Sequence, residues 1–245
     1  MGDPETRIAS PYDAISRLYD PWSRSVTEDI AFYLEEAAKA APGPVVELGV
    51  GTGRIAVSVA ADGIRVIGID SSAEMLAVCR EQAELAGVDG LVDLRLGDYR
   101  DPPIPERVEL VLCPFRAYLH LSTDDDRLRA LRAAFELLVS GGRLVFDVFT
   151  PGPEDIEETH GRWLEREPGI FERAEWDTKD RVLTLSLRGP GEETTMALAW
   201  ISQDEWRGLL ERAGFEIAAC YGWFDRRPWA GEDDSVWIAR RPGVG

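Results

Sequence analysis

The sequence predicts an α/β protein, in which a mostly parallel sheet is covered by helices on both faces and a smaller antiparallel section follows. Two patterns support this. Strand-like and helix-like segments alternate through residues 44–150, whereas the later strand-like segments alternate apolar and polar residues, as half-buried antiparallel strands do. With 245 residues, 44% of them hydrophobic, the chain has enough apolar side chain to bury the core of one large domain.

Five short runs are the predicted parallel strands, because each is almost continuously apolar, as strands buried on both faces are. They lie at 44–48, 65–70, 92–96, 108–113 and 143–149. Helices are predicted between them at 54–61, 73–86 and 124–138. Ser71 and Glu74 predict a capping box for the second of these helices. Gly87 and the pair Gly141-Gly142 stand where helix C-caps are expected.

The final third predicts antiparallel strands at 171–177, 181–188 and 194–201. Ser202 and Glu205 form a second capping box, which opens a helix that ends at Gly214. Two more strands are predicted at 216–223 and 235–240. Seven of the eight tryptophans lie beyond residue 160, where they form either plain core or an aromatic wall over a ligand cleft.

The charge balance excludes whole classes of partner. The chain has 27 basic and 45 acidic residues, and a net charge of −18 repels the phosphates of nucleic acids and anionic lipids. No apolar run reaches the roughly 18 residues of a membrane helix, and the first residues lack the pattern of a secretory signal. Three scattered cysteines and two histidines form no zinc motif. We therefore expect a cytoplasmic protein with no nucleic-acid, membrane or metal partner.

The sharpest motif is the turn Gly49-Val-Gly51-Thr-Gly53 after the first predicted strand. Glycines there let the chain turn tightly and bring backbone N–H groups against a ligand. The spacing is not that of a dinucleotide fingerprint, because the sixth position from Gly49 is Arg54, and the G-K-[ST] of a Walker loop is absent. The turn therefore lacks the usual phosphate-binding signatures.

Acidic residues stand at the ends of three predicted strands, at Glu47, Asp70 and Asp98. Asp70 follows the glycine turn by about 20 residues, a distance at which an acid reaches a ribose and accepts from its hydroxyls. Asp98 is placed to accept from an exocyclic amine. Together the three carboxylates predict a crevice that suits a cationic nucleoside without phosphates.

In order and spacing these motifs resemble class I S-adenosylmethionine-dependent methyltransferases. The matching segments are VVELGVGTGRIA at 45–56, GIDSSAEML at 68–76, LGDY at 96–99, VELVLCPFRAYLHL at 108–121 and LLVSGGRLVFDVF at 137–149. The resemblance implies a doubly wound, mostly parallel seven-stranded sheet of the Rossmann-like methyltransferase fold. It implies the strand order 3-2-1-4-5-7-6 with strand 7 antiparallel, and a small antiparallel β insertion after strand 5. It also implies S-adenosyl-L-methionine as cofactor, with S-adenosyl-L-homocysteine as product.

Upstream of this core, Tyr12-Asp13 and Tyr19-Asp20-Pro21-Trp22 resemble the N-terminal lid of small-molecule members, including amine and aminosugar N-methyltransferases. Tyr12 and Tyr19 are seven residues apart and so share one helical face. Their rings either pack the lid or close over the sulfonium, a contact that favours electron-rich rings. The implied domains are lid helices at 1–42, the cofactor-binding core at 43–150, a substrate-side insertion at 151–201, and the last helix with strands 6 and 7 at 202–245.

The resemblance assigns roles to particular residues. Those expected to bind the cofactor are Tyr19, Glu47, Gly49, Gly51, Gly53, Asp70, Ser71, Met75, Asp98, Tyr99 and Pro114. Those expected to bind the acceptor are Tyr12, Arg116, Tyr118 and Asp147. Structural alternatives remain open: Met75 as core, Arg116 as the partner of an acid such as Asp124, and Asp147 as a sheet residue near a helix cap.

His120 is the candidate catalytic residue, since it follows the fourth predicted strand, where similar aminosugar methyltransferases carry a histidine. If the acceptor is an amine that arrives as an ammonium ion, a neutral imidazole there takes its proton as a general base. In the alternative, His120 packs under the lid and the enzyme only positions a neutral acceptor.

We therefore expect methyl transfer to a nitrogen or oxygen of a natural-product, aminosugar or amino-acid-like acceptor, by a monomer or homodimer. A nucleic-acid adenine methyltransferase is disfavoured, because Cys113-Pro114-Phe115-Arg116 lacks the required amide or acid and the second proline. The remaining alternative is a non-catalytic protein that binds the cofactor or a partner. Turnover to S-adenosylhomocysteine with an acceptor panel, against binding without turnover, separates the two.

Asp70→Ala should weaken binding of S-adenosylmethionine by about 1–3 kcal/mol, because the ribose hydroxyls lose their acceptor. Isothermal titration calorimetry on both proteins measures this, with a nicotinamide dinucleotide, for which no binding is expected, as the control ligand. Unchanged cofactor affinity in the variant contradicts the ribose assignment.

Overall fold

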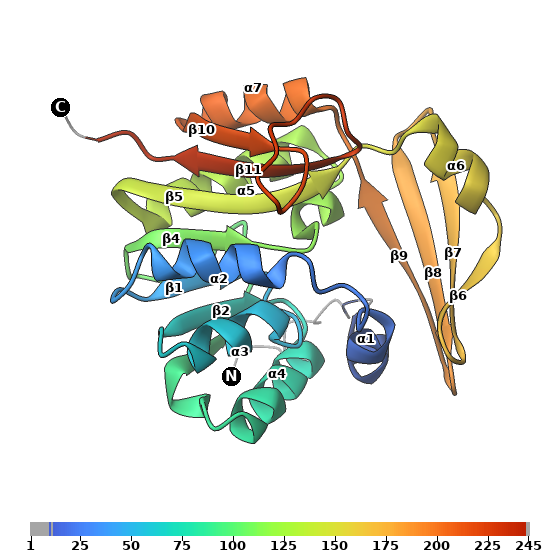
Figure 1. The fold of residues 1–245 in the computed structure, drawn as a ribbon, viewed down its shortest axis with the longest axis horizontal. Helices are drawn as coiled ribbons and strands as arrows, with labels where there is room; N and C mark the ends of the chain where they lie inside the picture. The colour runs from blue at the N-terminus through green and yellow to red at the C-terminus, as the bar shows by residue number, and fades with distance from the viewer. Residues whose placement is uncertain (1–9, 11, 244–245) are drawn as a thin grey trace, which may run out of the picture.

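The computed structural model describes residue 10 and residues 12–243. Residues 1–9 and 11, which belong to the predicted lid at 1–42, and residues 244–245 lie outside the described residues. Two sheets organise the fold: a seven-stranded sheet in the order β10-β11-β5-β4-β1-β2-β3, and a four-stranded sheet in the order β6-β7-β8-β9 (Figure 1). The predicted α/β fold class and strand order are confirmed. The last strand, β11, is antiparallel to both of its neighbours, β5 and β10, as predicted for strand 7.

The strands of the larger sheet are β1 (Val45–Leu48), β2 (Val66–Asp70), β3 (Val92–Leu96), β4 (Val108–Cys113), β5 (Leu138–Phe149), β10 (Glu216–Tyr221) and β11 (Asp234–Arg240). Those of the smaller sheet are β6 (Trp163–Glu167), β7 (Ile170–Asp177), β8 (Val182–Gly189) and β9 (Glu192–Ala199). The helices are α1 (Ser16–Trp22), α2 (Ile30–Ala38), α3 (Arg54–Ala61), α4 (Ala73–Leu85), α5 (Asp124–Leu137), α6 (Pro153–Thr159) and α7 (Gln203–Ala213), with 3-10 turns η1 (Asp13–Ile15), η2 (Asp89–Leu91) and η3 (Ala117–His120).

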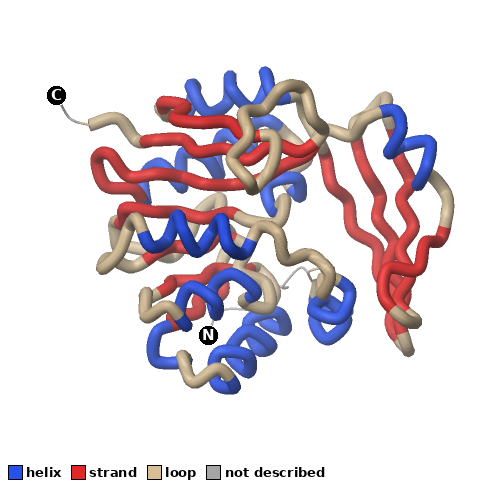
Figure 2. The backbone as a smooth tube through the Cα atoms, in the orientation of Figure 1, coloured by secondary structure: helices blue, strands red, loops and turns tan. Residues whose placement is uncertain are grey.

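The larger sheet is buried on both faces, as its continuously apolar strands predict. Neighbouring residues on one strand point to opposite faces, so Val45 packs with α2 and α3 on one side while Val46 packs with α5 and α7 on the other. Val236 and Trp237 divide between the two faces in the same way. Helices α2, α3 and α4 therefore cover one face and α5 and α7 the other, as the tube in Figure 2 shows.

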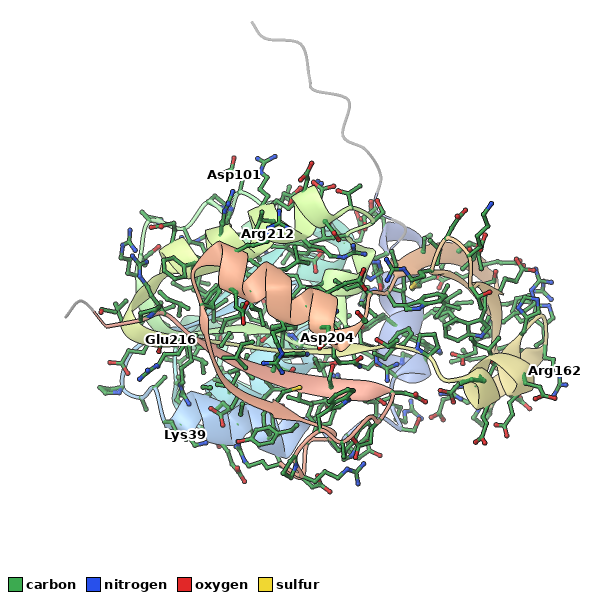
Figure 3. The ribbon with its side chains drawn as sticks, turned by 90° about the horizontal axis from the view of Figure 1, so that it is seen from above. Lys39, Asp101, Arg162, Asp204, Arg212 and Glu216 are labelled. Atoms are coloured by element: carbon green, nitrogen blue, oxygen red, sulfur yellow. The ribbon has the colours of Figure 1, made fainter. Side chains whose placement is uncertain are left out.

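Local signals place the helix ends, with two corrections. The capping box of α7 forms between Ser202 and Glu205 as predicted, and Figure 3 shows Asp204 and Arg212 near opposite ends of this helix, where each charge complements the helix dipole. The predicted box at Ser71 is wrong by one residue, because the Ser72 hydroxyl is the group that accepts from the Met75 N–H.

Gly141 and Gly142 do not form a helix C-cap, which is the second correction. Helix α5 ends at Leu137 and β5 begins at the next residue, so the two glycines lie within the strand. There the pairing of β5 with β4 shifts register, and Gly141 has a φ of +82°. Both β6 and α6 were also absent from the sequence prediction.

The four-stranded sheet stands beside the carboxyl ends of the core strands, with α1 between the two bodies (Figure 1). Ile15 and Leu18 are buried there together with core residues of β7, β8 and β9. A Cβ on Gly189 would lie 2.5 Å from Leu18 Cδ1, so β8 touches α1 directly. Trp200, Trp206 and Trp237 are buried in the core, whereas the other four tryptophans beyond residue 160 are half-buried.

Gly53 is a position where the fold should not tolerate a side chain. It has a φ of +90°, and a Cβ would lie 2.5 Å from Cys79 Sγ and 3.0 Å from Val57 Cγ2. Gly53→Ala should therefore lower the free energy of unfolding by about 2–3 kcal/mol. Gly63→Ala is the matched control, because Gly63 is also left-handed, at +81°, but a Cβ there would meet nothing within 4 Å, and it should lose about 1 kcal/mol. Urea denaturation measures both, and equal losses would contradict the clash.

Candidate active site

One cavity of about 330 Å³ opens where the carboxyl ends of β1, β2 and β4 meet. That size is in the range of small-molecule sites. Its walls come from the glycine turn, the end of β2, the segment after β4, the N-terminal segment and β9. The lining residues are Ser10, Tyr12, Tyr19, Glu47, Gly49, Val50, Gly51, Thr52, Arg54, Ile55, Asp70, Ser71, Met75, Tyr99, Pro114, Phe115, Ala117, His120 and Ala197.

Asp70 ends β2 with its carboxylate held by two backbone donors. The N–H of Gly51 donates to Oδ2 at 2.9 Å, and the N–H of Ser72 donates to Oδ1 at 2.8 Å. A carboxylate has about four acceptor sites, so acceptor capacity remains for a ligand. Burial raises the pKa of Asp70. The side chain is thus fixed in direction and still able to accept from hydroxyls in the cavity.

The glycine turn leaves the cavity floor open beside a buried acid. Gly49 and Gly51 are left-handed, and a Cβ on Gly51 would meet nothing within 4 Å, so there is room for a ligand at that point. Glu47 Oε2 has no hydrogen-bond partner among the described residues, although the residue is 2% exposed. Burial raises the pKa of Glu47 to about 8. An unpaired buried carboxyl on a cavity wall is costly, and a ligand donor would satisfy it.

The N-terminal segment closes one side of the cavity. Tyr12 precedes η1 and Tyr19 lies in α1, and their rings meet edge to face with centroids 5.8 Å apart. The aspartate after each tyrosine turns to the core: Ser72 Oγ donates to Asp13 at 2.5 Å, and Thr52 Oγ1 donates to Asp20. Both Tyr-Asp pairs therefore place a ring in the cavity and a carboxylate on a cavity-forming loop.

His120 lies at the end of η3 and connects three elements. Its Nδ1 is 3.2 Å from the Ala197 carbonyl of β9, so Nδ1 carries the proton and donates. Its Nε2 is 2.8 Å from Tyr12 Oη and accepts from that hydroxyl. Burial lowers the pKa of His120 to about 4. The imidazole is therefore neutral near pH 7, and its lone pair is engaged by Tyr12.

Five predicted site residues do not line the cavity: Gly53, Asp98, Arg116, Tyr118 and Asp147. Gly53 packs against α4. Asp98 turns to Arg100, whose Nε and Nη2 donate to it at 2.9 and 2.6 Å.

The remaining three are held by other groups. Arg116 pairs with Asp234 at 2.8 Å, not with Asp124, and lies over the Phe149 ring. Tyr118 is buried in the core against Tyr99. Asp147 accepts hydrogen bonds from Tyr33 and from the backbone N–H groups of Phe115 and Arg116.

Several lining residues were not predicted. Arg54 pairs with Asp29 through both Nη atoms, at 2.6 and 2.5 Å, and its guanidinium lies 4.9 Å from the Phe115 ring centroid. Thr52 and Phe115 are next to predicted site residues, so the glycine turn and the segment after β4 could have indicated them. Ala197 is far along the chain, in β9, and no local pattern connects it with the cavity.

The strand order of the larger sheet, with β11 antiparallel, and the four-stranded sheet after β5 are those of the Rossmann-like methyltransferase fold. Residues 45–142 match the family described as "Methyltransferase domain". An uncharacterized methyltransferase from Bacillus cytotoxicus is 30% identical over 138 residues, which are 56% of this chain and 62% of that protein. The chain therefore matches less than two thirds of that relative's length.

Solved structures resemble the fold over nearly the whole chain. The CcbJ methyltransferase from Streptomyces caelestis has a TM-score of 0.84 and 27% identity, covering 96% of this chain and 99% of that one. CalS10, an amino pentose methyltransferase from Micromonospora echinaspora solved with S-adenosylmethionine bound, has a TM-score of 0.66 and 23% identity, covering 97% and 99%. The predicted resemblance to methyltransferases is confirmed. None of the helices within the described residues is long and apolar enough to cross a membrane.

Within the predicted lid at 1–42, the segment 8–24 carries both tyrosines, and its residues 8, 9 and 11 lie outside the described residues. We expect S-adenosylhomocysteine to increase hydrogen-exchange protection of residues 12–24, because the cavity that it enters is closed by them. Equal protection with and without ligand would contradict a lid.

Thr52→Val should speed exchange in that segment by about five-fold, because Asp20 loses its buried donor. Arg17→Gln is the matched control. It removes an exposed pair with Glu81, so exchange should change by less than about two-fold.

Proposed function

We propose that this protein transfers the methyl group of S-adenosylmethionine to the nitrogen or oxygen of a small-molecule acceptor, with an amine as the favoured class. The observation that carries the proposal is that one cavity joins two kinds of wall. One wall holds the glycine turn and Asp70, and the other holds Tyr12, Phe115 and His120.

The residues present fit the cofactor. Asp70 keeps acceptor capacity for ribose hydroxyls, and the open space at Gly51 admits a ligand close to the backbone. The unpaired Glu47 Oε2 suits a donor such as an ammonium group. We assign Asp70, Ser71, Met75 and Tyr99 to the nucleoside side, and Glu47 with Gly49 and Gly51 to the amino-acid side.

The charges on the cavity wall favour a neutral or cationic acceptor. Arg54 is the cation among the described lining residues, and Asp29 already neutralises it through a two-point contact. His120 is neutral, and Glu47 and Asp70 are acids. A carboxylate or phosphate on the acceptor would find no free countercharge among these residues. The aromatic faces of Tyr12, Tyr19 and Phe115 instead favour a cation, or an amine about to become one.

The proposal of an amine acceptor does not rest on the similar solved structures. CalS10 is described as an amino pentose methyltransferase, but at 23% identity that likeness concerns the fold. The aromatic and acidic character of the cavity is the independent support for an amine.

Methyl transfer needs an acceptor lone pair in line with a carbon that the sulfonium of the bound cofactor activates. The protein therefore has to hold the acceptor in that line and exclude water. Tyr12 and Tyr19 close the side of the cavity formed by the N-terminal segment, and Phe115 forms the wall that follows β4. The Tyr12 hydroxyl, fixed by His120 Nε2, can accept from an acceptor N–H and orient its lone pair.

His120 is a weak base in this arrangement. Its pKa of about 4 lies well below that of a typical ammonium group, so transfer of the proton from ammonium to His120 is unfavourable. Its lone pair is also occupied by the Tyr12 hydroxyl. We therefore propose that the acceptor binds as the free amine, and that His120 positions Tyr12.

His120→Ala should lower kcat by about ten-fold, through loss of the hydrogen bond that fixes Tyr12. The ratio of wild-type to variant kcat should stay constant from pH 6 to 9.5, because a group with a pKa of about 4 does not change charge in that range. Both rates should rise with pH as the free amine becomes available. The measurement is release of S-adenosylhomocysteine with a panel of aminosugars, amino acid esters, a peptide N-terminus and phenols.

Tyr12→Phe is the matched variant, because it removes the hydroxyl but keeps the ring, and it should reproduce the loss. A ratio that falls toward high pH would assign general-base duty to His120. Binding of S-adenosylmethionine without turnover of any member of the panel would favour the non-catalytic alternative.

A further inference from the structure

Phe115 and Arg116, directly after β4, have strained backbones. Their φ angles are +56° and +63°, in the left-handed region that residues with a Cβ rarely adopt. Among the described non-glycine residues, no other two consecutive residues both have positive φ. Each such residue costs about 1 kcal/mol or more, so surrounding contacts must hold the pair in place.

The contacts come from Asp147, a buried residue of β5 that is 6% exposed. Strands β4 and β5 run parallel with Cys113 opposite Phe146, so Asp147 lies beside the chain that leaves β4. The Phe115 N–H donates to Oδ1 at 2.8 Å and the Arg116 N–H donates to Oδ2 at 3.1 Å. The Tyr33 hydroxyl of α2 donates to Oδ1 at 2.5 Å. Three donors thus satisfy a carboxylate that does not line the cavity.

This arrangement determines where the Phe115 ring lies. The ring is 6.1 Å from both Tyr19 and Trp22, edge to face, and the Arg54 guanidinium lies over it. Phe115 therefore joins the lid to the glycine-turn side of the cavity. If the backbone of Phe115 relaxed to negative φ, the ring would leave these contacts.

We propose that Asp147 is a positioning residue, whose carboxylate holds the Phe115–Arg116 backbone in its left-handed conformation and so places the Phe115 ring on the cavity wall. Its importance for methyl transfer rests on the proposed function. Its effect on the loop and on ligand binding does not.

The positioning is strongest with an ionised carboxyl, because a carboxylate accepts more strongly from the two backbone N–H groups than a neutral carboxyl does. Burial raises the pKa of Asp147 to about 6. The charged or titratable groups that act on it are Tyr33 and Asp29 at α2, Arg116 after β4, Cys113 in β4, and Arg54 in α3. The hydrogen bonds to the loop are therefore strongest well above pH 6 and weaken as the pH falls through that value.

The first experiment is hydrogen exchange of the segment 113–121 in wild type, Asp147→Asn and Glu36→Gln. Glu36 is a matched control, because it is a fully buried acid that pairs with Arg143 and lies outside the cavity. Asp147→Asn should speed exchange of this segment by about ten-fold, whereas Glu36→Gln should leave it unchanged. Unchanged exchange in Asp147→Asn overturns the proposal.

The second experiment measures S-adenosylhomocysteine affinity by calorimetry between about pH 5 and pH 8. At pH 8 the dissociation constant of Asp147→Asn should exceed that of wild type by about ten-fold, and at pH 5 the two should converge, since wild type is then protonated too. Titration of Glu47 and Asp70 is common to both proteins and cancels in the ratio. A ratio that does not change with pH overturns the role of the charge.

Tyr33→Phe is a second variant that tests the proposal if Asp147→Asn does not fold. It leaves both backbone donors but removes the hydroxyl that favours the ionised form of Asp147. Loss of wild-type affinity should then begin at a higher pH. An unshifted pH profile contradicts the proposal.

A double variant tests whether the effect passes through Phe115. In a Phe115→Ala background, Asp147→Asn should no longer weaken S-adenosylhomocysteine binding, because the ring to be positioned is missing. A full additional loss overturns this route. None of these measurements needs an acceptor, so absence of turnover would reject the proposed function and leave the test of Asp147 intact.

Discussion

The parallel pairing of β1 with β2 on one side and β4 on the other is the constraint on which the site depends. Parallel strands end at one edge of a sheet, so residues separated by tens of positions meet there. Glu47 and Gly49 leave β1, Asp70 ends β2, and the segment with Phe115 leaves β4. Because β1 is buried on both faces, packing of the core fixes its register with β2 and β4. The positions of the residues at the cavity edge are fixed as a result.

Four carboxylates in or near the cavity differ in the groups that contact them. Asp29 is neutralised by the two-point contact with Arg54, whereas Asp70 accepts hydrogen bonds from backbone amides of the glycine turn and of the segment before α4. Asp147 is held by two loop amides and Tyr33. Glu47 keeps an oxygen with no partner among the described residues, and its raised pKa shows the cost of burial. Asp29 and Asp147 therefore support the walls, whereas Asp70 and Glu47 line the cavity and are available to a ligand.

The N-terminal segment is held from two sides, which explains how a short helix with a proline inside it is ordered. On the core side, Asp13 and Asp20 accept from hydroxyls of Ser72 and Thr52. On the other side, the Trp22 indole donates to Glu172 of β7 at 3.0 Å. The four-stranded sheet therefore does more than enlarge the domain, since β7 anchors α1 through Trp22 and β9 contributes Ala197 to the cavity wall.

The sequence by itself determined the strands of the larger sheet and the glycine turn with Asp70, because those features depend on local patterns, whereas the order of the strands followed from the resemblance to class I methyltransferases. Buried parallel strands are continuously apolar, and a glycine turn followed by an acid such as Asp70 has its meaning within one βα unit. Short-range rules also located α7 and its capping box. They misplaced the cap of α4 by one residue, because Ser71 and Ser72 are both good N-caps and only the backbone direction separates them.

Only the tertiary structure decided which polar side chains face the cavity and which hold its walls. Asp98, Arg116 and Asp147 carry the right chemistry near the right strand ends, but Arg100, Asp234 and the loop amides engage them. A sequence records the type of a side chain and not the partner that competes for it. The Ala197 carbonyl, which sets the tautomer of His120, comes from a strand 77 residues away. Contacts of that separation follow from the packing of the two sheets, and no local pattern encodes them.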